Sequence, residues 1–174
     1  MNEIRIQEIE KLAKEVIKAL EERHETLSTA ESCTGGLVAS HIIDVPGSSA
    51  VMKGGIVAYQ NSIKEKLLGV NPQILTEKGA VSAETVLAMA NGALEQFNSD
   101  WAISTSGIAG PGGAEPGKPV GTVWMAVGKK GKIETRCEKF TGNRTQIREK
   151  SVYKVLDMLL LSINNQKSTC TKEH

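Results

Sequence analysis

The chain alternates between short apolar stretches of strand length and amphipathic stretches of helical period, and this alternation limits its fold more than any other feature. A strand that leads into a helix and then into another strand builds a parallel sheet with helices on its faces. Lys129-Lys130-Gly131 instead predicts a hairpin turn. We therefore expect an α/β fold, a three-layer α/β/α sandwich with a mixed, mostly parallel sheet of about five strands. Strands are expected at 26–29, 51–59, 102–106, 120–127 and 132–140, and helices at 4–23, 35–44, 82–97 and 143–163, with a short helix after Asn61.

The length of 174 residues, 40% of them apolar, is that of one domain. We expect residues 1–163 to form a single domain and the polar residues 164–174 to form a disordered tail. No apolar run approaches the ~20 residues of a membrane span, and the charged start, 1–7, does not resemble a signal peptide. A cytoplasmic protein without membrane contact is expected.

The charge balance argues against a nucleic-acid partner. The 21 basic and 20 acidic residues leave a net charge of +1, whereas a nucleic-acid surface needs clustered Lys and Arg. Aromatic residues, at 3%, are too few for base-stacking platforms. Cys33, Cys137 and Cys170 form no CxxC pair, so neither a zinc cluster nor a disulfide framework is indicated, and no metal or cofactor is expected.

A candidate nucleophile lies in the stretch Thr29-Ala30-Glu31-Ser32-Cys33-Thr34-Gly35-Gly36, between a strand and a helix. Such a turn sets a side chain beside the N–H groups of a helix start, where negative charge is stabilised. Ser32 is so placed. The alternative is a capped turn, with Ser32 or Thr34 as N-cap and Gly35 and Gly36 for close packing.

Two neighbours of Ser32 have their own interpretations. Cys33 is a rival nucleophile, because helix N-termini lower the pKa of thiols, but with no suitable histidine it ranks as a small buried neighbour. Glu31 either braces the turn through hydrogen bonds or binds a substrate hydroxyl.

A serine nucleophile needs a base. His24, His41 and His174 are poorly placed along the chain, so a Ser-His-Asp triad is not expected. Lys64 is the better candidate, because burial beside a cleft lowers the pKa of a lysine, and Tyr59 could relay the proton or orient the amine. The alternatives are a solvated helix lysine and an ordinary strand-end aromatic.

The Gly/Pro loop 107–119 is long for a simple connection. Its backbone N–H groups, among them those of Gly107, Gly110 and Gly112, could bind an oxyanion or a phosphate, with Ser106 adding a hydroxyl. It contains neither GxGxxG nor a Walker motif. Arg144 and Arg148, one helical turn apart, could clamp a phosphate; the alternative is a pair of solvated arginines.

Several motifs, taken together, closely resemble the CinA C-terminal-domain family over roughly residues 8 to 160. They are Ala30-Glu31-Ser32-Cys33-Thr34-Gly35-Gly36, Asp44-Val45-Pro46-Gly47-Ser48-Ser49-Ala50, Gly79-Ala80-Val81-Ser82, Gly107-Ile108-Ala109-Gly110-Pro111-Gly112-Gly113 and Lys118-Pro119-Val120-Gly121-Thr122-Val123. That family includes nicotinamide-nucleotide amidases, which hydrolyse nicotinamide mononucleotide (NMN) to nicotinate mononucleotide and ammonia in pyridine-nucleotide salvage. It also forms the C-terminal half of longer competence/damage-inducible proteins, and this chain looks like the stand-alone form.

The resemblance implies roles for individual residues. Ser32 corresponds to the nucleophilic serine, Tyr59 and Lys64 to the pair that activates it, and Arg144 to an arginine near the substrate. The resemblance also implies NMN as the small-molecule partner, and we expect a homo-oligomer, in the simplest case a dimer.

Two positions depart from the family pattern. Ser106 replaces the usual threonine and keeps its hydroxyl, whereas Asn143 replaces the aspartate before Arg144 and removes a charge. Because of Asn143, a nucleotide-binding or regulatory module without turnover stays open as an alternative. An amidase for another small carboxamide is a second one.

Overall fold

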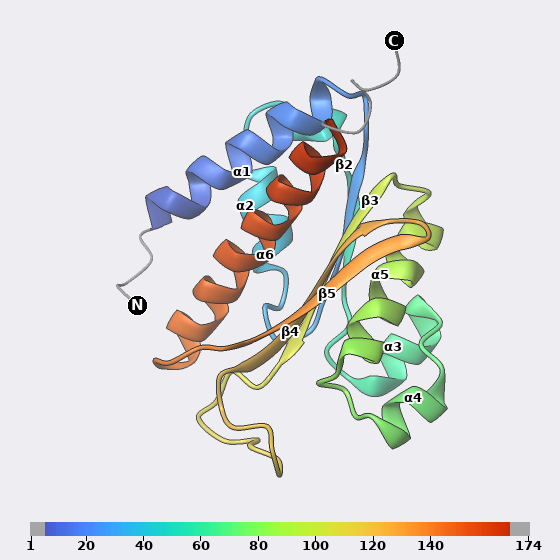
Figure 1. The fold of residues 1–174 in the computed structure, drawn as a ribbon, viewed down its shortest axis with the longest axis vertical. Coiled ribbons are helices and arrows are strands. Elements are labelled where there is room, and N and C mark those ends of the chain that lie inside the picture. The colour runs from blue at the N-terminus through green and yellow to red at the C-terminus, as the bar shows by residue number, and fades with distance from the viewer. Residues whose placement is uncertain (1–5, 168–174) are drawn as a thin grey trace.

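The computed structural model describes residues 6–167 (Figure 1). The strands lie close to the ranges predicted from the sequence. The elements are α1 Ile6–Glu21, β1 Leu27–Glu31, α2 Leu37–Ile43, the 3-10 turn η1 Ser48–Ala50, β2 Met52–Val57, α3 Asn61–Leu68, α4 Pro72–Glu77, α5 Ala83–Phe97, β3 Trp101–Gly107, β4 Thr122–Lys129, β5 Lys132–Lys139 and α6 Arg144–Lys167.

The five strands form one sheet in the order β2-β1-β3-β4-β5. β1 pairs in parallel with β2 and β3, while β4 runs antiparallel to both β3 and β5. The predicted α/β fold with a mixed five-stranded sheet is confirmed. Parallel pairs make up only half of the pairings, because the chain returns from β3 to β4 through a loop, without a crossover helix, and then turns back in a hairpin.

Helices cover both faces of the sheet (Figure 1). α1, α2 and α6 pack on one face around Ile103, Met125 and Leu156, whereas α3, α4 and α5 pack on the other around Ala102 and Met89. Neighbouring strand residues such as Ala102 and Ile103 serve opposite cores because side chains alternate along a strand. The expected three layers are therefore present.

The structure departs from the expected elements at a few points. The six-residue α4 is too short to show a helical period, but Asn71 caps it by accepting a hydrogen bond from Gln73 N at 2.9 Å. α6 continues to Lys167, so the predicted tail began too early. The rest of that tail lies outside the described residues. No helix within residues 6–167 has the length and apolar character needed to cross a membrane.

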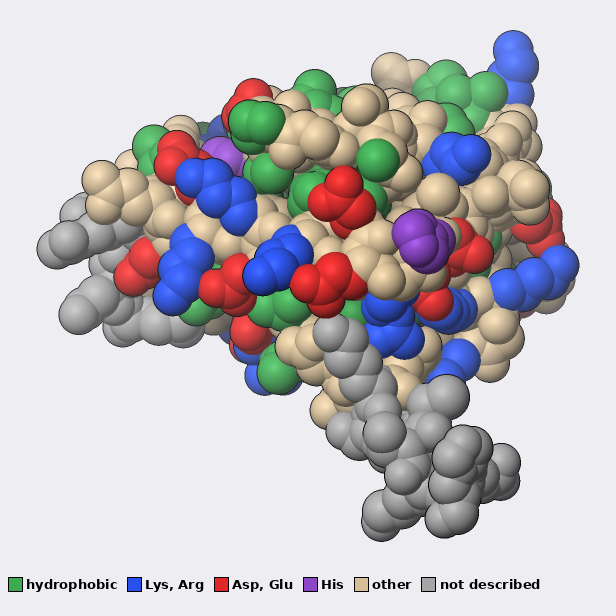
Figure 2. Space-filling model, turned by 90° about the horizontal axis from the view of Figure 1, so that it is seen from above, with side chains coloured by type: hydrophobic (Ala, Val, Ile, Leu, Met, Phe, Trp, Pro, Cys, Tyr) green, Lys and Arg blue, Asp and Glu red, His purple; other side chains and the backbone are tan. Residues whose placement is uncertain are grey.

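Acidic and basic side chains are mixed on the surface. On the face that Figure 2 shows, Lys and Arg side chains lie among Asp and Glu side chains, and neither sign gathers in one continuous patch. Exposed pairs such as Lys11 and Glu15, 3.9 Å apart on α1, contribute about 0–1 kcal/mol each. The fold therefore owes little of its stability to these surface charges.

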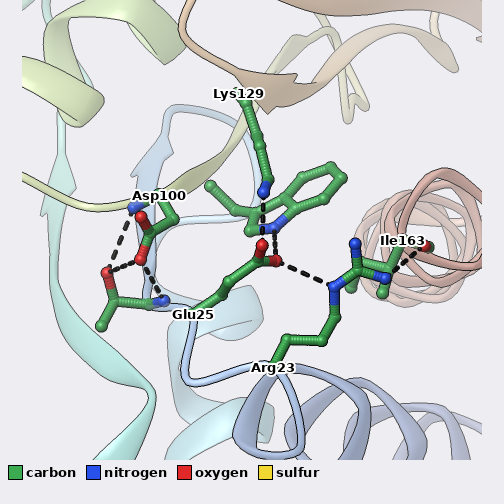
Figure 3. A network of polar contacts seen from close by, with 7 residues as sticks. Arg23, Glu25, Asp100, Lys129 and Ile163 are labelled. Atoms are coloured by element: carbon green, nitrogen blue, oxygen red, sulfur yellow. Dashed lines mark hydrogen bonds and ion pairs between the residues drawn. The ribbon is translucent and has the colours of Figure 1, made fainter. Parts of the chain in front are cut away.

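A cluster of polar contacts around Glu25 lies at the end of the sheet where β1 and β3 begin (Figure 3). The Glu25 carboxylate accepts hydrogen bonds from Lys129 Nζ at 2.5 Å, Trp101 Nε1 at 2.7 Å and Arg23 Nε at 3.2 Å. Arg23 also donates to the Ile163 carbonyl on α6 at 2.9 Å. One carboxylate thus links the segment that follows α1 to β3 and β4 and, through Arg23, to α6.

The Glu25 carboxyl stays charged in this cluster. Burial alone raises its pKa, but the hydrogen bonds from Lys129 and Trp101 and the charges of Lys129 and Arg23 outweigh burial. The pKa of Glu25 is therefore held below its ordinary value of 4.5. A depressed folded-state pKa adds stability above the unfolded-state pKa, and this stability is lost as the pH falls through the folded-state value.

We predict that Glu25→Gln lowers the free energy of unfolding at pH 7 by about 1–3 kcal/mol, because the cations around it lose their counter-charge and one acceptor oxygen becomes an NH2 donor. The difference in the free energy of unfolding between the variant and wild type should shrink as the pH falls below 4.5, because the Glu25 carboxyl of wild type then becomes protonated. Denaturant unfolding at several pH values measures this. Glu10→Gln, at an exposed position of α1, serves as the control. A difference that stays constant with pH would contradict the prediction.

Candidate functional site

Ser32 is the first residue beyond β1, in a turn held to the neighbouring strand. Its N–H donates to the Thr105 carbonyl of β3 at 2.9 Å, and its own carbonyl accepts from Gly35 N at 3.2 Å. Gly36, with φ of 93°, then leads into α2. The sequence prediction of a strand-to-helix turn at this place is confirmed, and the hydroxyl lies at the carboxyl edge of the parallel strands, where α/β sheets bind their ligands.

The amine of Lys64 lies beside this hydroxyl. Lys64 is 1% exposed, and its Nζ is 3.2 Å from Ser32 Oγ, 2.8 Å from the Ala58 carbonyl and 3.2 Å from the Tyr59 carbonyl. It reaches them because helix side chains lean toward the helix N-terminus, and α3 begins shortly after β2. No carboxylate of residues 6–167 forms an ion pair with Lys64. Desolvation therefore lowers the pKa of Lys64 below its ordinary value of 10.5.

The partners of Lys64 can serve both protonation states of its amine. A neutral amine has two N–H groups and one lone pair, and the carbonyls of Ala58 and Tyr59 can only accept. Both N–H groups are thus engaged by carbonyls, and the lone pair is left for the only partner that can donate, the Ser32 hydroxyl. The protonated amine instead donates to all three. A proton can therefore pass between Ser32 and Lys64 without a rearrangement of heavy atoms.

The position of α3 depends on a close contact with α5. A Cβ on Gly92 of α5 would lie 2.1 Å from the carbonyl of Leu68, the last residue of α3, so only glycine permits this approach. Leu68 is buried in the same core as Ala93. Packing on α5 therefore fixes the helix that carries Lys64.

Glu31 braces the turn from within. Its buried carboxylate accepts from Thr34 Oγ1 at 2.7 Å and from the N–H groups of Gly36, Val38 and Ala39 at 2.9, 3.1 and 2.8 Å. Of the two interpretations of Glu31, the geometry favours the brace, and the substrate-binding one is wrong. These N–H groups are also unavailable to a substrate oxyanion, contrary to the expectation for the helix start.

Arg148 holds the same turn from outside. Its Nε donates to the Cys33 carbonyl at 3.2 Å and its Nη2 to the Thr34 carbonyl at 2.7 Å. A Cβ on Gly35 would lie 3.4 Å from Nη2. The predicted role of Arg148 in a phosphate clamp is wrong, because its guanidinium binds the carbonyls of this turn and does not line the pocket that Arg144 lines. Thr34, Gly35 and Gly36 likewise form the turn and do not contact the pocket.

A pocket of about 280 Å³ opens over Ser32 and Lys64. This volume is near the lower end of the usual range for ligand pockets, which begins at about 300 Å³. Within residues 6–167, no group of His, Cys, Asp or Glu side chains is arranged to hold a metal ion. Of the predicted site residues, Ser32, Tyr59, Lys64, Ser106, Gly107, Gly110, Gly112 and Arg144 line the pocket.

The glycine loop contributes hydrogen-bond donors to this pocket. Within the described part of the chain, the N–H groups of Ala109, Gly110, Gly112 and Gly113 donate to no other group. The Ser106 hydroxyl is different, since it donates to the Ala80 carbonyl at 2.7 Å and can only accept from a ligand. An anion in the pocket would thus meet backbone N–H groups.

Arg144 and Tyr59 meet at the mouth of the pocket. Arg144 donates through Nη1 to the Gly110 carbonyl at 2.9 Å and through Nη2 to Tyr59 Oη at 3.3 Å. The Tyr59 side chain is 62% exposed and does not contact Lys64. The phenol is therefore not placed to relay the proton. Tyr59 instead orients the amine, the other role considered for it, through its main-chain carbonyl.

Asn143 caps α6 just before Arg144. Its Oδ1 accepts from Gln146 N at 3.0 Å, and Gln146 Oε1 accepts from Asn143 N at 2.9 Å. This reciprocal pair is a capping box, which an amide forms as well as a carboxylate. The departure from the family aspartate thus leaves the start of the helix, and with it Arg144, in place.

Cys33 is buried in the core on the α1, α2 and α6 side. Burial raises the pKa of its thiol to about 12, so the thiol stays protonated at neutral pH. Cys33 is the small buried neighbour that the sequence indicated.

Sequence reasoning missed several lining residues, among them Asn61 and Glu115. Asn61 was expected to cap a short helix, but Gln60 holds the N-cap position and Asn61 is the first residue of α3, the helix that carries Lys64. Glu115 lies in the glycine loop, which was considered only for its backbone N–H groups. Both residues could have been found from the sequence, because Asn61 lies between Tyr59 and Lys64 and Glu115 lies within the loop itself.

Comparison with known proteins gave consistent results. A family model described as the CinA C-terminal domain matches residues 9–163. A CinA-like protein of Geotalea daltonii is 51% identical over 134 residues, 77% of this chain and 32% of that protein. One of Prochlorococcus marinus is 46% identical over 156 residues, 88% of this chain and 36% of that protein. The chain thus spans about a third of the length of these curated relatives.

Solved structures match over nearly their full length. The competence/damage inducible protein CihA from Agrobacterium tumefaciens superposes with a TM-score of 0.88 at 40% identity, covering 94% of this chain and 99% of that one. A competence-damaged protein (CinA) superfamily protein from Klebsiella pneumoniae has the same TM-score at 35% identity, covering 90% and 98%.

We predict that Glu31→Gln lowers the free energy of unfolding by about 1–3 kcal/mol, because the amide NH2 faces donors that the carboxylate oxygen accepted. Thermal or denaturant unfolding measures the change. Glu95→Gln, at an exposed position of α5, is the matched control. Equal stability of Glu31→Gln and wild type would show that the brace contributes nothing.

Proposed function

Because this chain belongs to the CinA C-terminal domain family, we propose that it is a nicotinamide-nucleotide amidase of pyridine-nucleotide salvage. It hydrolyses the carboxamide of NMN to nicotinate mononucleotide and ammonia through a serine acyl-enzyme. The observation that carries this proposal is the buried Lys64 amine, without an acidic partner in the described chain, 3.2 Å from the Ser32 hydroxyl.

The first step is attack of Ser32 Oγ on the carboxamide carbon. Its proton passes to the lone pair of Lys64, which the carbonyls of Ala58 and Tyr59 keep directed at the hydroxyl. The resulting ammonium donates to both carbonyls and returns a hydrogen bond to Ser32 Oγ. A general base placed in this way contributes about 10²- to 10⁴-fold in rate.

The oxyanion of the tetrahedral intermediate needs donors. Glu31 occupies the N–H groups of Gly36, Val38 and Ala39. The role of donor therefore falls to the N–H groups of the glycine loop that are free within the described chain, those of Ala109, Gly110, Gly112 and Gly113. One such donor is worth about 3 kcal/mol in the transition state.

Lys64 then acts as the acid. It gives the proton to the departing nitrogen, which leaves as ammonia, and the nicotinoyl group stays as an ester on Ser32. Water enters, Lys64 removes a proton from it, and hydrolysis of the ester frees the carboxylate and regenerates the serine.

The charges around the pocket suit a pyridinium nucleotide. Arg144 brings a guanidinium to the mouth, where the phosphate would lie, and Glu115 brings a carboxylate to the same pocket. NMN carries a negative phosphate and a positive pyridinium ring, so it can meet both charges. This complementarity supports NMN over an uncharged amide.

We predict that purified protein releases ammonia from NMN and that Ser32→Ala and Lys64→Met each lower kcat by about 10²-fold or more, since each removes one half of the reacting pair. Cys33→Ala, next to the nucleophile, should keep a rate near that of wild type. Circular dichroism checks that each variant is folded.

The outcomes of this assay are distinct. A wild-type rate in Ser32→Ala would overturn the proposal. Saturable binding of NMN by wild type with no ammonia would indicate a nucleotide-binding module without turnover. Faster hydrolysis of another carboxamide in a substrate panel would redirect the proposal to that amide.

A further inference from the structure

β5 is an edge strand, and its outer edge pairs with no other strand of the described chain. In Figure 1 it lies at the front of the sheet, with α6 to one side and α5 to the other. Most of its side chains are exposed. An exposed edge of this kind can accept another strand through main-chain hydrogen bonds.

The pairing with β4 determines which backbone groups point outward. Phe140 N donates to the Gly121 carbonyl at 2.9 Å, one step beyond the β4–β5 ladder. Hydrogen-bonded pairs alternate in an antiparallel ladder, so the even-numbered residues of β5 bond to β4. The N–H and C=O groups of Ile133, Thr135 and Cys137 are therefore directed to the open edge.

The side chains of the even-numbered residues alternate in charge. They lie on the face of α6, because they pair with Val123, Met125 and Val127 of the core on that side. Positive and negative charges alternate along the strand in the order Lys132, Glu134, Arg136 and Glu138.

We propose that β5 pairs antiparallel with β5 of a second copy of this chain, about a twofold axis at Thr135. This register sets Glu134 opposite Arg136 of the partner subunit and Lys132 opposite Glu138 of the partner subunit. Every charge of the row then faces its opposite, and the outward groups of Ile133 and Cys137 hydrogen-bond across the interface.

Other registers are less favourable. An axis at Arg136 sets that residue against its own copy and Glu134 against Glu138. An axis at Glu134 likewise sets Glu134 against its copy and Lys132 against Arg136. Like charges directly opposite each other destabilise a strand pair. Charges on an edge strand usually prevent pairing, but the register centred on Thr135 pairs all four charges of the row with opposite charges.

A hollow beside the strand supports a partner on this face. About 330 Å³ of space lies between Glu134 and Arg136 of β5 and Met158, Leu161 and nearby residues of α6. Leu161 is 54% exposed. Because the axis runs perpendicular to the sheet, both copies bring α6 to the same face, where the exposed Leu161 side chain can be covered.

Charge exchange tests the interface. Sedimentation velocity of the full chain at low and physiological salt should show a dimer that weakens as salt rises. Glu134→Arg and Arg136→Glu should each raise the dimer Kd by about tenfold or more, because each makes like charges face each other twice. The double variant Glu134→Arg/Arg136→Glu should recover the dimer, since the exchanged charges again match.

The controls separate pairing at this interface from a general effect of net charge. Glu95→Arg changes the net charge as Glu134→Arg does, but on α5, and should leave Kd unchanged. Arg136→Glu and the double variant both lose the Arg136–Glu138 ion pair within the strand, so recovery in the double variant excludes that loss as the cause. A monomeric wild type, dimers in both single variants, or no recovery in the double variant would each overturn the proposal. No substrate is present, so the result is independent of the amidase proposal.

Discussion

The site depends on one buried amine that has no counter-charge within the described chain. Burying an ammonium without a counter-charge costs free energy, and this cost lowers the pKa of Lys64 below its ordinary value of 10.5. Lys64 meets only a hydroxyl and two carbonyls, and these three partners can serve both the neutral amine and the ammonium. The same burial that disfavours the charge thus produces a base next to Ser32.

The pairing of the strands determines how far the Ser32 hydroxyl lies from the Lys64 amine. β1 and β2 are parallel neighbours, and Ala58 N donates to the Glu31 carbonyl at 2.8 Å just before Ser32. The carbonyls that hold Lys64 therefore lie one strand away from the nucleophile. Glu31 and Arg148 fix the turn after it, one through N–H groups and the other through carbonyls. The carboxylate of Glu31 and the guanidinium of Arg148 therefore restrict a turn that its glycines would otherwise leave flexible.

The features that arise from the periodicity and topology of the chain could be predicted from the sequence. The roles of side chains that hydrogen-bond to the backbone could not. Parallel strands end at the same edge of a sheet, so Ser32 and Lys64 could be expected there together. Nothing in the spacing of Arg144 and Arg148 tells that one lines the pocket and the other binds carbonyls. Tyr59 was considered for its phenol, yet its main-chain carbonyl contacts the Lys64 amine. Every residue has a main-chain carbonyl, so residue type cannot predict such a contact.

The central claim is that burial makes the Lys64 amine a better proton acceptor for Ser32, and the pKa of this amine tests it most directly. Heteronuclear NMR of labelled protein can follow the Lys64 side chain through a pH titration, with Lys64→Met identifying the signal. We predict a midpoint clearly below 10.5, the ordinary value. A midpoint at or above that value would mean that the amine stays charged beside Ser32, and it could not accept the proton.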